Sequence, residues 1–118
     1  MKLYFDKPEF HTDINLTIRR GVKWATKSME HVLAYDAKDE FSNYSKPIFY
    51  CQVVEQKVLK YEDIPKEDFS LIHDSACKSY ESMFEEMKRI YGGFSDKEIV
   101  TLLYFIKRDE MYDYIPDE

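Results

Sequence analysis

The sequence has few of the residues that mark several common protein classes. Its 118 residues include only two cysteines, three glycines and one tryptophan. Cys51 and Cys77 do not form a CxxC pair, and the three histidines are scattered, so the spacing predicts no zinc site. Repeats and low-complexity linkers are also absent, which argues against a fibrous or multidomain chain. We expect neither a metal ion nor an organic cofactor.

Long apolar runs are missing as well. No run approaches the roughly 20 residues that a membrane helix needs. The first ten residues carry acids and a proline where a signal peptide requires an apolar stretch. With 44% hydrophobic and 34% charged residues, the composition is that of one globular domain. The sequence therefore predicts a cytoplasmic protein with no membrane partner.

The charge is distributed unevenly along the chain. The net charge is −6, yet residues 109–118 hold five acids and no base, which leaves 17 bases against 18 acids elsewhere. We predict one domain over residues 1–108 and an acidic tail over residues 109–118, for which packing as an extra edge segment and a solvated tail are both open. The body has no broad basic face, so duplex DNA is not an expected partner. Residues 18–27 are the exception, with four bases and no acid.

The hydrophobic pattern predicts alternating strands and helices. Residues 2–5 predict a short strand. Residues 8–20 predict a helix, because Pro8 suits a first turn and apolar residues follow at roughly helical spacing, with Gly21 as the stop. The segment 35–45 is polar and mixed, which favours an extended loop.

The second half of the chain has the clearest signals. Residues 48–54 are apolar on both faces, which is typical of a central strand, and Cys51 within them is expected to be a buried structural thiol. Residues 79–90 place their apolar side chains on one helical face, and Gly92 caps that helix. Residues 99–106 predict a second buried strand. We expect an α+β domain with a small mixed, curled sheet or partial β-barrel and two main helices packed against it.

The basic turn that follows the first predicted helix has the most distinctive chemistry. Gly21 permits a positive φ, Lys23 offers a charge, Trp24 offers a flat face for a base, and Thr26 offers a hydroxyl. A structural interpretation is also open: Gly21 caps the helix, Lys23 complements its dipole, and Trp24 fills the core. The residues alone leave both readings open.

The order of these segments resembles the ASCH family, whose small domains have a PUA-like fold. The resemblance rests on Gly21, Lys23 and Thr26 as Gly-x-Lys-x-x-Thr, on the apolar strand that contains Val53 and Val58, and on the later helix and closing strand. It implies a cleft beside the turn that binds RNA, a nucleotide or a modified base. The candidate ligand-binding residues there are Arg19, Arg20, Gly21, Lys23 and Trp24.

Some members of the family resemble amidohydrolases that act on N4-acetylcytidine. By position, that resemblance implies that Lys23 activates or polarises and that Thr26 is the nucleophile. The family's glutamate has no counterpart in residues 72–76, where Asp74 is the nearest acid and His73 the other titratable group. The loop at residues 35–41 also lacks the glycine that the family often has there.

Three functions follow from these features. The first is a binding domain for RNA, a nucleotide or a modified nucleoside at the basic turn. The second is an amidohydrolase of an acylated nucleoside, with Lys23, Thr26 and Asp74 as its catalytic set. The third is a protein-interaction or inhibitory domain that keeps only the fold and has a protein partner.

Overall fold

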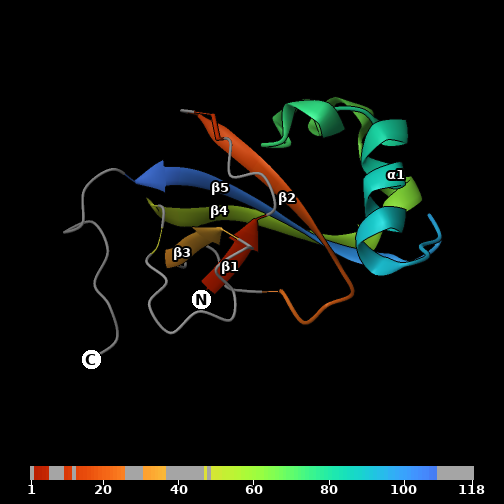
Figure 1. Ribbon diagram of the computed structural model, residues 1–118, viewed down its shortest axis with the longest axis horizontal. Helices are drawn as coiled ribbons and strands as arrows, with labels where there is room; N and C mark the ends of the chain where they lie inside the picture. Colours follow the sequence, from red (N-terminus) through yellow and green to blue (C-terminus); the bar gives the residue numbers. More distant parts are fainter. Residues whose placement is uncertain are drawn as a thin grey trace.

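The chain forms one curled five-stranded sheet with a helix packed on one side (Figure 1). The computed structural model describes residues 2–5, 10–11, 13–25, 31–36, 47 and 49–108. The strands are β1 (Lys2–Phe5), β2 (Ile14–Arg20), β3 (His31–Asp36), β4 (Phe49–Lys60) and β5 (Ile99–Arg108). Between β4 and β5 come the 3-10 helices η2 (Tyr61–Asp63), η3 (Lys66–Leu71) and η4 (Ser75–Cys77), and then α1 (Tyr80–Tyr91).

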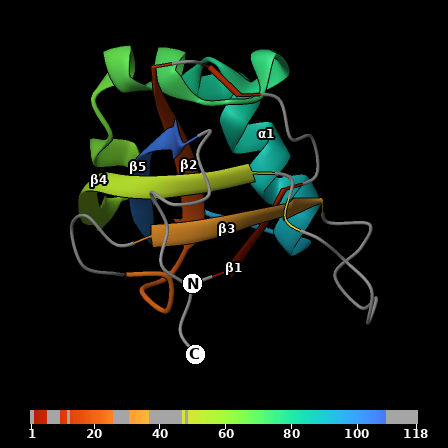
Figure 2. The ribbon, with the colours of Figure 1, turned by 90° about the vertical axis from the view of Figure 1, so that its left-hand side faces the viewer.

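The sheet order is β1-β3-β4-β5-β2, so β1 and β2 are its two edges. Strands β1 and β3 run parallel, and the other three pairs are antiparallel. A register shift between Val53 and Glu55 interrupts the long β4–β5 pair. Such a bulge adds local twist, and Figure 2 shows how far β2 is turned from the direction of β3. The predicted α+β class and mixed, curled sheet are confirmed.

The helix predicted over residues 8–20 is wrong, because residues 14–20 form β2. Every residue of β2 pairs with β5, from Ile14 opposite Ile106 to Arg20 opposite Val100. Leu16 and Ile18 point into the core with a period of two, which the helical spacing of the same apolar residues hid. One α-helix, and not two, therefore packs against the sheet within the described ranges.

Three strands predicted from the sequence are present in the structure. Strands at residues 2–5, 48–54 and 99–106 are confirmed as β1, β4 and β5, with β4 continuing to Lys60. The loop predicted over residues 35–45 is wrong at residues 35 and 36, which belong to β3, and residues 37–45 lie outside the described residues. The predicted tail, residues 109–118, lies outside the described residues.

The core has two parts, one on each face of the sheet. Leu102 and Tyr104 on β5 belong to the larger cluster, which also contains Met83 and Met87 of α1. Their neighbours Leu103 and Phe105 belong to the smaller cluster, together with Cys51. Strand β5 is thus buried on both faces, as its uninterrupted apolar sequence predicts. No helix in the described part of the chain is long and apolar enough to cross a membrane.

Helix α1 is fixed by caps at both ends. Ser79 accepts a hydrogen bond from the backbone N–H of Ser82 at 3.1 Å, and the Ser82 hydroxyl is 3.1 Å from the Ser79 N–H. At the other end Gly92 has φ +67°, and its N–H donates to the Lys88 carbonyl. These contacts satisfy backbone groups that the helix itself leaves without partners.

We expect Ser79→Ala to lower the free energy of unfolding by about 1 kcal/mol, because it removes this N-terminal cap. Urea denaturation of the full chain measures the change. Ser75→Ala is the matched control, since Ser75 is an exposed serine outside α1, and it should stay within about 0.5 kcal/mol of the parent. Equal losses in the two variants would contradict a capping role for Ser79.

Candidate functional site

A cavity of about 140 Å³ lies between the edge strands and α1. Residues 4–5 of β1, residues 16–19 of β2, the segment 72–74 with Cys77, and four residues of α1 line it. Leu16 also pairs with Ile72 in a single parallel bridge, which brings the segment before η4 against the free edge of β2. The curl of the sheet therefore places both edge strands, β1 and β2, beside this cavity.

Arg19 connects the two edge strands at the wall of this cavity. Its Nη2 donates to the Tyr4 carbonyl at 3.1 Å, and its Nε donates to the Thr17 hydroxyl at 3.1 Å. The guanidinium also lies over the ring of Phe5 at 5.0 Å and over that of Trp24 at 5.4 Å. These contacts hold a positive charge in a fixed place beside the hollow.

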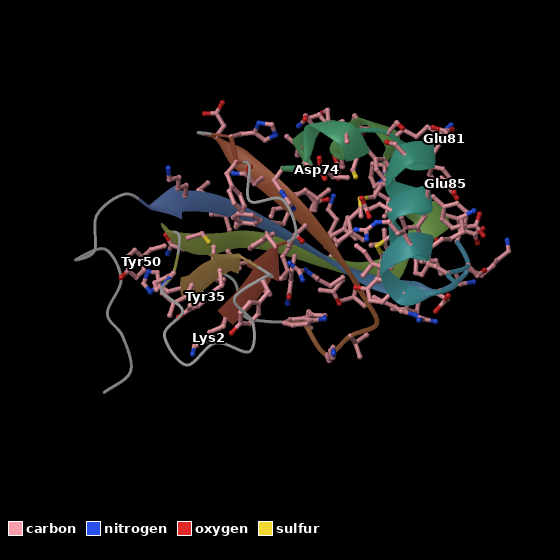
Figure 3. All side chains as sticks on the ribbon, in the orientation of Figure 1. Lys2, Tyr35, Tyr50, Asp74, Glu81 and Glu85 are labelled. Carbon is pink, nitrogen blue, oxygen red and sulfur yellow. The ribbon has the colours of Figure 1, made fainter. Side chains whose placement is uncertain are left out.

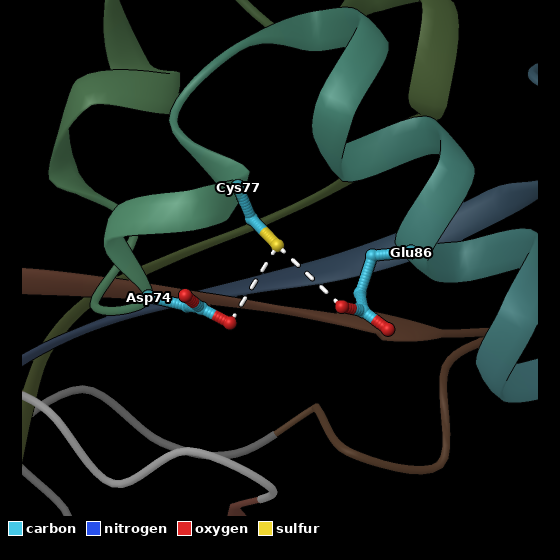
Figure 4. A group of neighbouring side chains, drawn as sticks. All are labelled: Asp74, Cys77 and Glu86. Atoms are coloured by element: carbon cyan, nitrogen blue, oxygen red, sulfur yellow. Dashed lines mark hydrogen bonds between the residues drawn. The ribbon is translucent and has the colours of Figure 1, made fainter.

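The opposite wall of the cavity is acidic. Asp74 caps η4, where its Oδ1 accepts the Ala76 N–H at 2.9 Å. The Cys77 Sγ lies 3.7 Å from Asp74 Oδ2 and 3.7 Å from Glu86 Oε2, as Figure 4 shows. Burial, together with these two carboxylates, raises the pKa of Cys77 to about 12, so its thiol is protonated at neutral pH.

These three side chains are also a set that could hold a metal ion. Their ligand atoms all lie within 4.8 Å of one another. Asp74 and Cys77 are buried, at 8% and 3% exposed, and Glu86 is half-buried on α1. Two short elements, η4 and α1, therefore bring two carboxylates and one thiol together.

Among the described residues, three that were singled out from the sequence line the cavity: Arg19, His73 and Asp74. Arg19 and Asp74 line it from opposite walls, and Figure 3 shows Asp74 beside α1. Arg20 points elsewhere: it forms a salt bridge with Glu98 at 2.7 Å. That contact and the Ser95 N–H lower the pKa of Glu98. Lys23 is exposed and does not line the cavity.

The predicted positive φ at Gly21 is confirmed, at +77°. The turn at Gly21 follows β2, and hydrogen bonds from both the N–H and the carbonyl of Gly21 to β5 hold it in place. The Gly21 N–H donates to the Ile99 carbonyl at 2.8 Å, and the Gly21 carbonyl accepts the Thr101 hydroxyl at 2.7 Å. A glycine is therefore needed for backbone geometry at the end of a strand, where the sequence predicted the end of a helix.

Trp24 is held by cations of its own chain. The Lys23 ammonium is 5.1 Å from its ring centre, Arg19 also lies over it, and the ring packs against the smaller core cluster. These contacts support the structural interpretation of Trp24, while base stacking on it stays a prediction. Thr26 lies outside the described residues, so its pairing with Lys23 also stays a prediction.

Sequence analysis missed Thr17, Cys77 and Glu86 as cavity residues. The predicted helix hid Thr17: in a strand, Thr17 and Arg19 point to the same face. Nothing in the spacing of Cys77 and Glu86 indicates a site, because the two residues belong to different elements. The one available signal was the Asp74–Cys77 interval, which is too short and too common to be specific.

Comparisons with known proteins place this fold. No protein-family model matches the sequence, and no curated protein matches it. The ASCH domain from Lactobacillus crispatus JV V101 matches in structure, with TM-score 0.54 and 13% identity over 81% of this chain. A protein from Enterococcus faecalis V583, assigned to a domain family of unknown function, matches with TM-score 0.56 and 15% identity over 82% of this chain.

The chain therefore has the fold of an ASCH domain, as the order of its segments predicted. The matches cover 65% and 62% of the two solved chains, so this protein spans less than two thirds of their length.

Proposed function

We propose that the cavity between β2 and α1 binds one planar ring of a nucleotide or of a single-stranded RNA. The main support for this proposal is a single cavity that has the Arg19 guanidinium on one wall and the carboxylates of Asp74 and Glu86 on the other. Its volume of about 140 Å³ is close to that of an apolar cavity of about 150 Å³ that takes up benzene, so it accommodates one six-membered ring. A pyrimidine fits this space better than a purine does.

The chemistry of the two walls suits a base joined to a phosphate. The carboxylates of Asp74 and Glu86 accept N–H donors from the edge of a base. Arg19 lies at the other wall, and Lys23 is exposed on the turn that follows β2. Positive charge there favours a phosphate, while the nearly neutral body argues against a long duplex. The proposed ligand is therefore a nucleotide or a short single strand.

The contacts in the cavity favour binding over amide hydrolysis. A threonine nucleophile needs a base that takes its proton. Thr17 is the threonine that lines the cavity among the described residues; Arg19 Nε donates to its hydroxyl at 3.1 Å, and a guanidinium cannot act as a base. An amidohydrolase mechanism would need Lys23 beside the substrate, but Lys23 does not line the cavity.

Titration with the four nucleoside 5′-monophosphates tests this proposal. We expect the pyrimidine nucleotides to bind most tightly and ribose 5-phosphate, which has no base, not to bind. Asp74→Asn should weaken binding at least about tenfold, because it removes a carboxylate charge from the cavity wall and turns Oδ2, beside the Cys77 thiol, from an acceptor into a donor. The isosteric change keeps Oδ1 as the acceptor for the Ala76 N–H.

Glu85→Gln provides the matched control, because Glu85 lies on the outer face of α1 and pairs with Lys88 (Figure 3). Lys23→Ala should weaken binding only a few-fold and reduce its salt dependence. Equal affinity for nucleotides and ribose 5-phosphate, or no binding at all, would overturn the proposal.

A further inference from the structure

We propose that the hydrogen bond between Lys78 and His11 makes the acidic wall of the cavity sensitive to pH. The bond holds the segment 70–78 against the start of β2 while His11 is neutral, and protonation of His11 releases that segment. Neither residue lines the cavity, but the segment carries Asp74 and Cys77, which do. The inference needs no nucleotide, and only its consequence for binding rests on the proposed function.

The Lys78 ammonium lies among three acceptors. Its Nζ is 2.6 Å from the Ile72 carbonyl, 3.0 Å from the Ser70 carbonyl and 2.7 Å from His11 Nε2. An ammonium has three hydrogens to donate and accepts none, so His11 Nε2 is the third acceptor. The His11 ring is then neutral and carries its proton on Nδ1. The bond therefore exists only in one protonation state of His11.

Asn15 fixes His11 to the start of β2. The His11 N–H donates to Asn15 Oδ1 at 2.7 Å, and Asn15 Nδ2 donates to the His11 carbonyl at 3.1 Å. Asn15 itself is fully buried, at 0% exposed. The next residue, Leu16, pairs with Ile72 in the isolated parallel bridge. The bond between His11 and Lys78 therefore ties the segment 70–78 to β2 at a second point.

Protonation of His11 turns this attraction into repulsion. An imidazolium has a hydrogen on both ring nitrogens, so it cannot accept the hydrogen bond from Lys78. Two positive charges would then lie 2.7 Å apart in a partly buried place, where water screens them less than at the surface. The protonated ring still has the Ile72 carbonyl, 3.2 Å from Nε2, as an acceptor, so Lys78 is the group that must move.

The other titratable groups around this contact give a second positive charge little support. Burial lowers the pKa of Lys78, and the Asp74 carboxylate opposes that effect only in part. Asp13, on the same segment as His11, is exposed, and exposed charges pair weakly. His73 is the other histidine of this region, and its ring stacks on that of Phe10 at 5.1 Å. A test must therefore separate His73 from His11.

Lowering the pH should release the segment 70–78. Neutral His11 stabilises the docked segment, so this stabilisation is present above about pH 6.5, where an ordinary histidine is neutral, and is lost as the pH falls below that value. The Ala76 N–H donates to Asp74 Oδ1, and the Cys77 N–H donates to the Asp74 carbonyl. Release exposes both amides. On the proposed function, it also displaces the acidic wall and weakens nucleotide binding.

Amide hydrogen exchange of the full chain, without nucleotide, at about pH 7.5 and about pH 5.5 tests the inference. After correction for intrinsic exchange rates, the protection of the Ala76 and Cys77 amides should fall at least about tenfold at the lower pH. The Leu103 amide lies in β5, between β2 and β4, and should keep its protection. Imidazole ¹⁵N shifts should show His11 with its proton on Nδ1 at the higher pH.

Three variants assign the effect to this contact. His11→Gln should remove the pH dependence, because an amide oxygen accepts from Lys78 at both pH values. Lys78→Met should remove it as well, since the protonated ring then meets no ammonium. His31→Gln is the matched control: His31 lies on β3, opposite Gln52, and this variant should respond to pH as the parent does.

Two results would overturn the proposal. One is protection of the Ala76 and Cys77 amides that does not change with pH in the parent. The other is an equal fall in His11→Gln, which would assign the titration to another group such as His73. If Lys78→Met fails to fold by circular dichroism, His11→Gln still decides, because it keeps an acceptor for Lys78.

Discussion

Replacing Tyr61 with alanine should lower the free energy of unfolding by about 3–5 kcal/mol, the usual cost of removing a buried aromatic ring. Tyr61 is fully buried at 0% exposed, where β4 ends and η2 begins. Its ring contacts four other rings, with centroid distances from 5.0 to 5.8 Å, belonging to Phe69, Tyr80, Phe84 and Phe94. It is therefore the central contact between η3, α1 and the sheet.

Tyr61→Phe is the matched control for this prediction. The hydroxyl donates to the Tyr80 carbonyl at 2.8 Å, and burial raises the pKa of Tyr61, so the group is a neutral donor. Removing the hydroxyl alone should cost about 1 kcal/mol. Urea denaturation followed by circular dichroism measures both variants. Equal losses for alanine and phenylalanine would show that the hydrogen bond, and not the ring packing, dominates at this position.

Arg19→Met should lower the free energy of unfolding by about 2–3 kcal/mol, since it removes charged hydrogen bonds and cation–π contacts between the two sheet edges. Arg19 bonds to Tyr4 of β1 and to Thr17 of β2 and lies over the rings of Phe5 and Trp24. The same change should weaken nucleotide binding, because the cavity loses its positive wall. Denaturation and nucleotide titration of the variant measure the two effects separately.

The adjacent arginine provides the control. Arg20 is exposed, and its salt bridge with Glu98 joins two partly exposed side chains, 41% and 30% exposed. Exposed ion pairs contribute about 0–1 kcal/mol, so Arg20→Met, which also removes the contact with the ring of Tyr91 at 5.6 Å, should lower the free energy of unfolding by less than Arg19→Met does. Similar losses in both variants would show that Arg19 has no special role between β1 and β2.

The elements with strong local signals were predictable from sequence. Helix α1 has apolar residues on one face, Ser79 before it and Gly92 after it, so its limits follow from local chemistry. The first half of β4 and most of β5 are apolar, which is typical of strands covered on both faces. In each case the residues that define the element are neighbours in the chain.

Strand β2 shows where this reasoning fails. The apolar residues of the segment 14–20 fit both a helical and a strand pattern, and Pro8 favoured a helical start. The choice depends on β5, which lies about 80 residues later in the sequence and pairs with every residue of β2. Intrinsic propensity is a weak prior that such long-range pairing overrides.

The candidate site was predictable only in part. Arg19, His73 and Asp74 were named from the sequence, and all three line the cavity. Thr17 was missed because it was assigned to a helix. Cys77 and Glu86 were missed because 3-10 and α-helical elements bring them together without any recognisable spacing. The described residues of the turn after β2, which include Lys23 and Trp24, do not line the cavity.

The sequence by itself determined the α+β class, the capped helix α1, the two-sided burial of β5 and the positive φ at Gly21. These features depend on local periodicity, capping and glycine's missing Cβ. Only the tertiary structure decided that residues 14–20 form an edge strand and that Arg19 faces Asp74 and Glu86 across one hollow. The reason is physical: pairing between distant strands and the curl of the sheet set both outcomes.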